Sequence, residues 1–303
     1  MDTIVTIRGL SKRFGTFSAL KNVNLDIRAG EVLGFIGPNG AGKSTTIRLL
    51  LGILKPSSGT AKIFGEDVWS RAVEIHRRIA YVPGDVNLWP NLTGGEIIDL
   101  FIKLQGSGDV ARRDELIGRF ELDPSKKSRT YSKGNRQKVA LIAAFASDAD
   151  LFILDEPTSG LDPLMERVFQ ECVEEIKAKG KSVLLSSHIL SEVERLCDRV
   201  AIIREGEIIE TGTLEELRHL TRSLFQVETR IPADRLSTFP GVHDLEQTER
   251  KAVFQVDSEQ VGVVLEYLTG LGVMKLESMP PTLEDLFMRH YEKQGGRQGA
   301  SHA

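Results

Sequence analysis

The sequence predicts an α/β core over residues 1–220, followed by a small α+β domain over residues 221–292. In the core, short apolar runs alternate with segments of helical pattern, which is typical of a largely parallel sheet covered by helices on both faces. After Thr221 the pattern changes to closely spaced strands with few helices. A chain of 303 residues has room for two such domains, at roughly 100–200 residues each.

The first elements of the core alternate between apolar and polar residues. This pattern at 3–8 and 20–27 predicts two strands of a half-exposed antiparallel sheet. Up to residue 83 we also expect strands at 31–36, 60–64 and 79–82, and helices at 44–54 and 70–78.

Residues 88–147 have a mainly helical pattern, which indicates a helical subdomain inserted into the sheet. The core then continues with strands at 151–154, 183–186, 200–204 and 207–210, and with helices at 163–179 and 189–196. For the small domain we expect strands at 224–229, 242–247, 252–256 and 273–277, and helices at 259–268 and 282–290. Residues 293–303 are small and polar, and we expect them to form a mobile tail.

The composition is that of an ordinary globular protein. Hydrophobic residues make up 41% of the chain, and 39 basic against 43 acidic residues give a net charge of −4. These values exclude a wholly disordered chain, a collagen and a basic nucleic-acid arm. Two cysteines, Cys172 and Cys197, make no disulfide framework, and we expect both to be buried in a reducing compartment.

The sequence contains neither a secretory signal pattern nor an apolar run of the roughly 20 residues that a membrane-spanning helix needs. The longest clean apolar run is 139–146. We therefore expect a cytoplasmic protein whose association with a membrane requires a partner.

The strongest local motif matches the phosphate-loop pattern G-x-x-x-x-G-K-S/T between an apolar strand and a helix. Glycines let the backbone approach a phosphate and turn amide N–H groups towards it, and the helix N-terminus adds positive potential. The Lys43 side chain can reach the outer phosphates, and the Ser44 hydroxyl suits Mg²⁺. The alternative, a glycine-rich turn without a ligand, is disfavoured by the flanking strand and helix. The predicted site consists of Gly37, Pro38, Asn39, Gly40, Ala41, Gly42, Lys43, Ser44 and Thr45.

Two carboxylates follow the apolar strand at 151–154, at the end where open α/β sheets place their ligands. Asp155 is expected to hold Mg²⁺, directly or through water, and Glu156 to polarise the attacking water. Alone, such a pair would indicate only a cap. The phosphate loop earlier in the chain favours the functional interpretation.

With these motifs, residues 1–220 resemble the ATP-binding subunit of an ABC transporter. The resemblance implies a phosphate-loop ATPase core with an antiparallel β subdomain and an inserted helical subdomain. It also implies that ATP is the substrate and Mg²⁺ the cofactor. Its catalytic groups would be Lys43, Glu156 and His188.

The segment 131–138 is similar to the signature of this family, usually written LSGGQ. Ser132 and Gly134 match its serine and second glycine, whereas Lys133 and Asn135 depart from the commonest residues. The resemblance implies that this segment caps the γ-phosphate of ATP held by another subunit. A serine N-cap and a helix dipole suit an anion. Taken alone, the string indicates no more than a capped basic helix.

Three further positions match family motifs. Residues 159–162 resemble the loop that crosses the dimer interface, although Asp162 followed by Pro163 is also a typical helix start. His188 matches the histidine that contacts the γ-phosphate. Phe14 matches the aromatic residue that stacks on adenine, although a core or surface phenylalanine would have the same appearance in sequence.

One position departs from the family pattern. Where related sequences have Gln after the strand that ends at Val82-Pro83, this chain has Gly84-Asp85. Glycine has no side-chain oxygen for the metal or the attacking water. Either Asp85 substitutes through water, or the site works without this contact. A hinge role of the glycine remains in both cases, because glycine eases backbone motion.

Residues 279–287 resemble the end of the C-terminal domain of some bacterial ABC exporter ATPases, including those of drug and antibiotic export. We expect the small domain to support a dimer, with regulation or contact to a partner as alternatives. The whole resemblance predicts an ATPase that works as a head-to-tail homodimer with a separate membrane permease, at the cytoplasmic face of the membrane. Export is preferred over import, and both over action on DNA or ribosomes, so we expect no nucleic-acid partner.

Overall fold

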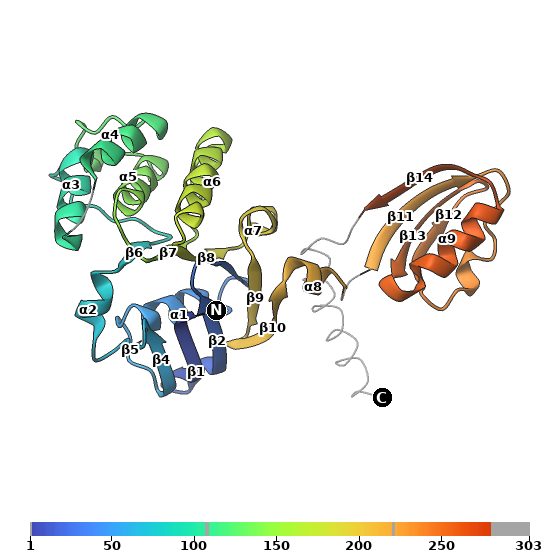
Figure 1. The fold of residues 1–303 in the computed structure, drawn as a ribbon, viewed down its shortest axis with the longest axis horizontal. Coiled ribbons are helices and arrows are strands. Elements are labelled where there is room, and N and C mark those ends of the chain that lie inside the picture. The colour runs from blue at the N-terminus through green and yellow to red at the C-terminus, as the bar shows by residue number, and fades with distance from the viewer. Residues whose placement is uncertain (1, 107–108, 220–221, 280–303) are drawn as a thin grey trace. The chain divides into compact units, whose positions relative to one another are not determined.

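The computed structural model describes residues 2–106, 109–219 and 222–279 (Figure 1). It divides into two compact units, Met1–Thr211 and the part of the chain from Gly212 onward, so the division falls shortly before the boundary expected at residue 221. Among the described residues, no helix is both long and apolar enough to cross a membrane. Each unit is described by itself.

The first unit is built on a six-stranded sheet with the order β10-β9-β3-β8-β7-β6. Strands β9, β3, β8, β7 and β6 pair in parallel, as the alternation of strands and helices predicts. The strands β3, β7 and β8 are buried along their whole length, which suits a sheet covered on both faces. The elements are β3 (Val32–Ile36), α1 (Lys43–Leu50), α2 (Ala72–His76), β6 (Ile79–Val82), β7 (Leu151–Asp155), α6 (Pro163–Ala178), β8 (Ser182–Ser187), α7 (Leu190–Leu196), β9 (Arg199–Arg204) and β10 (Glu207–Thr213).

A second sheet has the order β2-β1-β4-β5, with antiparallel pairing throughout. Its strands are β1 (Thr3–Phe14), β2 (Phe17–Arg28), β4 (Ser58–Ile63) and β5 (Glu66–Asp67). The first two are longer than the sequence pattern predicts, because they continue to a tight hairpin in which Phe14 pairs with Phe17. Their apolar side chains join the core cluster that also holds Ile47 of α1 and Ile153 of β7.

The predicted helical insertion consists of α3 (Gly94–Gln105), α4 (Val110–Arg119), the short 3-10 helix Ser128–Thr130 and α5 (Lys133–Phe145). A capping box fixes the start of α3: the Thr93 side chain accepts from the Glu96 amide, and the Glu96 carboxylate accepts from the Thr93 amide. Asp109 caps α4 by a simpler contact, in which its carboxylate accepts from the backbone amides of Ala111 and Arg112. These local signals explain why the helices begin where they do.

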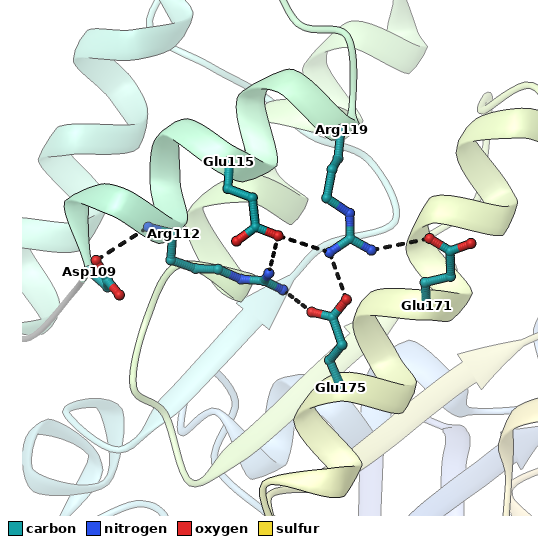
Figure 2. A network of polar contacts seen from close by, with 6 residues as sticks. All are labelled: Asp109, Arg112, Glu115, Arg119, Glu171 and Glu175. Atoms are coloured by element: carbon teal, nitrogen blue, oxygen red, sulfur yellow. Dashed lines mark hydrogen bonds and ion pairs between the residues drawn. The ribbon is translucent and has the colours of Figure 1, made fainter.

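A charge network joins α4 of the insertion to α6 of the core (Figure 2). Arg119 contacts both Glu175 and Glu171 of α6, at 2.7 and 3.2 Å, and Arg112 also pairs with Glu175. Burial raises the pKa of Glu175, but the two guanidinium groups outweigh this effect and hold it below its usual range. Each pair is partly exposed and contributes little alone, so the network acts mainly by fixing α4 against α6.

The second unit contains a four-stranded antiparallel sheet with the order β12-β13-β11-β14, and α9 packs against one face of it. Phe225 and Phe254 stack at 5.9 Å in its core, beside Val264 and Leu268 of α9. The sequence pattern missed α8. The expected helix at 282–290, the tail and most of the 279–287 motif lie outside the described residues. The elements are α8 (Leu214–His219), β11 (Arg222–Thr229), the 3-10 helix Leu236–Thr238, β12 (Val242–Gln247), β13 (Lys251–Asp257), the 3-10 helix Ser258–Gln260, α9 (Val261–Gly270) and β14 (Val273–Met279).

Candidate functional site

The loop between β3 and α1 requires its glycines. Gly40 and Gly42 have φ values of 81° and 117°, a region that favours glycine. A Cβ at Gly37 would lie 2.3 Å from the Ile203 carbonyl oxygen, and a Cβ at Gly42 would lie 2.6 Å from a methyl group of Leu20. Close packing at Gly37 and Gly42, and a left-handed backbone at Gly40 and Gly42, explain why these positions of the loop are glycine.

A cavity of about 280 Å³ opens over this loop. Its lining comprises most residues of the loop from Pro38 to Thr45, together with Phe17, Ala19 and Glu156. The loop precedes α1, so the unpaired amides at the start of that helix adjoin the cavity. This arrangement suits an anionic group such as a phosphate chain.

Lys43 is the cation of the cavity, and its side chain is only 5% exposed. Its Nζ donates to the carbonyl oxygen of Gly37 at 2.6 Å and lies 3.9 Å from Glu156 Oε1. Burial lowers the pKa of Lys43, and the nearby carboxylates of Glu156 and Asp155 oppose that shift. The carbonyl oxygens that now accept from the ammonium group are neutral. A charged phosphate oxygen would be a stronger hydrogen-bond acceptor for it.

Asp155 ends β7, and its carboxyl group is buried. Burial raises its pKa, against the influence of the Ser186 and Ser44 hydroxyls, and Glu156 raises it further. Among the described residues, Asp155 Oδ1 has no hydrogen-bond partner. A buried carboxylate oxygen left unpaired near a hydroxyl fits a divalent cation, which prefers oxygen ligands. The residues present therefore fit Mg²⁺, which Ser44 and Asp155 would hold.

Glu156 directly follows the strand in a left-handed conformation, with φ 48°. In a regular strand, the side chains of consecutive residues point to opposite faces. The left-handed conformation at Glu156 instead leaves both carboxylates, of Asp155 and Glu156, near enough to raise the pKa of Lys43. The Glu156 amide donates to the Ser186 carbonyl at 2.8 Å, and its Oε2 lies 3.5 Å from Nδ1 of His188. Both side chains are partly exposed, so a water molecule can reach them. The structure thus brings Lys43, Asp155, Glu156 and His188 together.

The segments around Ser132 and Gly160 lie side by side although they are far apart in sequence. Ser132 caps α5 by accepting from the Asn135 amide at 3.2 Å. Lys133 Nζ donates to the Ser159 hydroxyl at 2.7 Å, and a Cβ at Gly134 would lie 2.4 Å from the Gly160 carbonyl oxygen. The described lining of the cavity includes neither segment.

Asp162 has the structural role that its sequence context indicates. Its Oδ1 accepts from the amides of Leu164 and Met165, each at 3.1 Å, and Pro163 occupies the first helical position of α6. This capping gives Asp162 a structural role within a single copy of the chain. Its contact across a dimer interface stays a prediction.

Sequence reasoning missed Phe17. Phe17 lines the cavity, whereas Phe14, its partner across the hairpin, is not among the lining residues. Both rings are largely exposed, and Lys12 Nζ lies 5.0 Å from the centre of the Phe14 ring. Phe17 precedes Ala19, another lining residue, by two positions on β2, so both side chains lie on one face. No local sequence signal separates Phe17 from Phe14, because the position of Ala19 at the cavity is known only from the structure.

The two rings make a matched pair for a test of nucleotide stacking. If Phe17 stacks on the base, Phe17→Ala weakens ATP binding by about 5–10-fold, the size of one aromatic contact of about 1 kcal/mol. Phe14→Ala then changes binding less than twofold. Titration with a fluorescent ATP analogue measures both, and a larger loss in Phe14→Ala would instead assign the stacking to Phe14.

Gly84 lies beside the carboxylates, since a Cβ there would come within 3.1 Å of the Asp155 carbonyl oxygen. Its φ lies outside the left-handed region, so the backbone permits a side chain. Restoring the family's residue is therefore feasible, at the cost of a shift of a few tenths of an ångström.

Gly84→Gln is expected to lower the Mg²⁺ concentration for half-maximal ATP hydrolysis by about 2–10-fold, the worth of one regained hydrogen bond. Gly84→Ala adds the Cβ without the amide and serves as the control. We expect melting temperatures to show that both variants lose no more than about 1 kcal/mol of stability. Equal metal dependence in wild type, Gly84→Ala and Gly84→Gln would show that Gly84 does not mark a lost metal contact.

Comparison with known proteins places this site in a family. The model of the family described as ABC transporter matches residues 20–159, and that described as ATP-binding protein DrrA1-3-like, C-terminal domain, matches residues 212–291. An uncharacterised ABC transporter ATP-binding protein of Nostoc is 41% identical over 206 residues, 66% of this chain and 61% of that protein.

Two relatives match along nearly their whole length. The bacitracin transport ATP-binding protein of Bacillus licheniformis is 33% identical over 95% of this chain and 97% of its own. The Nod factor export ATP-binding protein I of Burkholderia orbicola is 32% identical over 94% and 96%.

Solved structures agree with these sequence matches. A solved ATP-binding subunit of an ABC transporter has a TM-score of 0.67 at 35% identity, over 72% of this chain and 93% of that one. A dimeric bacterial ABC transporter cassette has a TM-score of 0.65 at 26% identity, over 70% and 99%. The predicted fold class and ATPase activity are therefore confirmed, and this chain belongs to the ATP-hydrolysing, ATP-binding subunits of ABC transporters.

Proposed function

We propose that this ATPase works as a head-to-tail homodimer that powers export through a separate membrane permease. The observation that carries the proposal is the separation of two complementary halves. Lys43 and Glu156 adjoin the cavity, whereas the helix start capped by Ser132 does not line it in the same chain. A second copy in the opposite orientation would bring its Ser132 and Gly134 to the exposed side of the bound ATP.

Each group has a distinct task within that dimer. The glycine-rich loop and Lys43 bind the phosphates through amides and the ammonium group, and Phe14 or Phe17 stacks on adenine. Glu156 accepts a proton from the attacking water, and His188, beside it, contacts the γ-phosphate. Mg²⁺ held by Ser44 and Asp155 would neutralise charge on the phosphates.

Export is preferred because of the relatives that match nearly the full chain. Their names record bacitracin transport and Nod factor export, and the match includes the second unit. We propose that residues 1–220, with the helical subdomain at 88–147, form the ATP-binding domain. Residues 221–292 then support the dimer, and the permease holds the protein at the cytoplasmic face of the membrane, without a nucleic-acid partner.

Disulfide cross-linking tests the head-to-tail arrangement. The two native cysteines are buried, so cysteines introduced as Asn39→Cys and Ser132→Cys are the accessible ones. With ATP, Mg²⁺ and a mild oxidant we expect a covalent dimer on a non-reducing gel. On the same gel, each single variant, and the double variant treated without ATP, should migrate as a monomer, because no disulfide links two copies. Absence of the dimer from a double variant that still binds ATP would contradict the arrangement.

Isolation with the membrane partner tests the transport role. We expect the tagged chain, expressed with the product of a neighbouring permease gene, to bring that membrane protein through purification in detergent. Reconstituted vesicles then report the direction of transport. Uptake towards the compartment that contains the ATPase would overturn export, and co-purification of nucleic acid instead of a membrane protein would overturn both.

A further inference from the structure

A buried carboxyl group on α7 has no part in the proposed ATP site. The Glu192 side chain belongs to a residue that is only 5% exposed, and the Ser187 hydroxyl donates to its Oε2 at 2.6 Å. Its Oε1 is buried and has no hydrogen-bond partner among the described residues. A buried acid with one oxygen unpaired is costly to retain for packing alone, because leucine or methionine would fill similar space without that penalty.

Ser187 connects this carboxyl group to the backbone on both sides of His188. It is the last residue of β8, and its Oγ accepts from the Ile189 amide at 3.0 Å while donating to Glu192. The hydroxyl therefore ties together the two residues that flank His188. Among the described residues no side chain caps the start of α7, so the Ser187 hydroxyl supplies a side-chain contact that holds this turn.

The same carboxyl group also adjoins the loop that carries Glu156. Thr158, two residues after Glu156, is buried, and its hydroxyl lies near enough to affect Glu192. Burial raises the pKa of Glu192, and the hydroxyls of Ser187 and Thr158 oppose this shift. The other titratable neighbours are Glu166 of α6, which raises the pKa, His188, which lowers it, and the buried thiol of Cys197.

We propose that Glu192 is a positioning residue for ATP hydrolysis, and that its carboxyl group, through the Ser187 hydroxyl, holds the His188 turn in place against the loop of Glu156. The proposal rests on the proposed roles of Glu156 and His188. The distance of 3.5 Å between their side chains then depends on two backbone segments that meet at Glu192. A helix-dipole role would require only a surface acid in the first turn, and would leave Ser187 out of the network.

Three substitutions test this positioning role. Glu192→Ala and Ser187→Ala each remove one end of the tie, so we expect each to lower kcat about tenfold while KM for ATP changes less than twofold, because the phosphate loop is untouched. The double variant should be no slower than the slower single variant, since both break one linkage. Glu192→Gln keeps the shape of the side chain and an oxygen that can accept from Ser187, and should keep at least half of the wild-type kcat.

Glu194→Gln is the matched control, because it changes the same residue type on the same helix at a partly exposed position. It should keep the wild-type kcat. Should Glu192→Ala not yield folded protein, Ser187→Ala and Glu192→Gln carry the test. Wild-type kcat in Ser187→Ala or Glu192→Ala would overturn the proposal, and so would an equal loss in Glu192→Gln and Glu192→Ala.

The raised pKa of Glu192 has its own measurement. An unfolded glutamate releases its proton near pH 4.5, whereas the buried one retains it to higher pH. The folded state then binds more protons than the unfolded state, so stability falls as pH rises above about 4.5. We expect the melting temperature of Glu192→Gln to rise relative to that of wild type as pH increases above about 4.5, and a difference that does not change with pH would contradict the raised pKa of Glu192. His188→Ala separates the proposed roles of Glu156 and His188 from the positioning role of Glu192. If His188→Ala hydrolyses ATP at the wild-type rate, the assigned site is wrong. If His188→Ala is slow but the Glu192 and Ser187 variants hydrolyse normally, only the positioning role is wrong.

Discussion

Lys43→Ala is expected to weaken ATP binding at least 100-fold and to reduce ATP hydrolysis to background. Lys43 is the buried cation of the cavity, and its Nζ already contacts the loop carbonyl of Gly37. A hydrogen bond between charged groups contributes about 1.5–3 kcal/mol, and about 1.4 kcal/mol corresponds to a factor of ten. Loss of two such contacts to phosphate oxygens accounts for the expected factor.

The measurement is calorimetric titration with ATP, accompanied by phosphate release and a melting curve. Lys62→Ala removes an exposed lysine of β4 and serves as the control, with wild-type binding expected. Because burial lowers the pKa of Lys43, the alanine variant should fold at least as well as wild type near neutral pH. ATP affinity and turnover equal to those of wild type would refute the assignment of the phosphate loop.

The parts of this fold that could be predicted from sequence are those encoded over short distances. Apolar runs identify the buried strands β3, β7 and β8, and the phosphate loop is set by local backbone demands at Gly40 and Gly42. The fold class follows from the order of these elements. The sequence therefore distinguishes strands from helices. It does not predict the lengths of β1 and β2, because these depend on pairing across a hairpin.

The parts that escaped prediction depend on contacts between distant segments. Phe14 and Phe17 have the same chemistry and lie three positions apart, so only the packing of the hairpin beside the loop distinguishes them. The close approach of Gly134 to the Gly160 carbonyl joins two segments that no local pattern connects. Glu192 appears in sequence as an ordinary acid in the first turn of a helix, and only its burial and its bond to Ser187 single it out.

Sequence motifs also leave open which of two roles a residue performs. Asp162 illustrates this, because the cap that it makes on α6 fully satisfies one carboxylate oxygen within the chain. Lys133, a departure from the family signature, donates to Ser159 and so joins the signature segment to the neighbouring loop. Both observations are explained inside a single copy, and neither depends on a dimer.

Glu156→Gln is expected to bind ATP with near wild-type affinity but to hydrolyse it ~10²–10⁴-fold more slowly, the usual contribution of a general base. Glutamine keeps the size of the side chain and its contact distance to His188 while removing its basicity. Glu205→Gln is the control, because Glu205 has nearly the same left-handed backbone, with φ 50°, at an exposed turn between β9 and β10. A loss of rate shared by both variants would point to backbone strain instead of chemistry.

The same substitution tests whether the ATP-bound protein is a dimer. If hydrolysis separates the two copies, a variant that binds ATP without cleaving it accumulates as a dimer in the presence of ATP and Mg²⁺. Light scattering after size-exclusion chromatography measures this directly, with Glu156→Gln,Lys43→Ala as the control that cannot bind ATP and stays monomeric. Normal hydrolysis by Glu156→Gln would exclude Glu156 as the general base, although it is the one carboxylate among the described residues that line the cavity. A slow variant that stays monomeric with ATP bound would instead leave the chemistry intact and overturn the head-to-tail dimer.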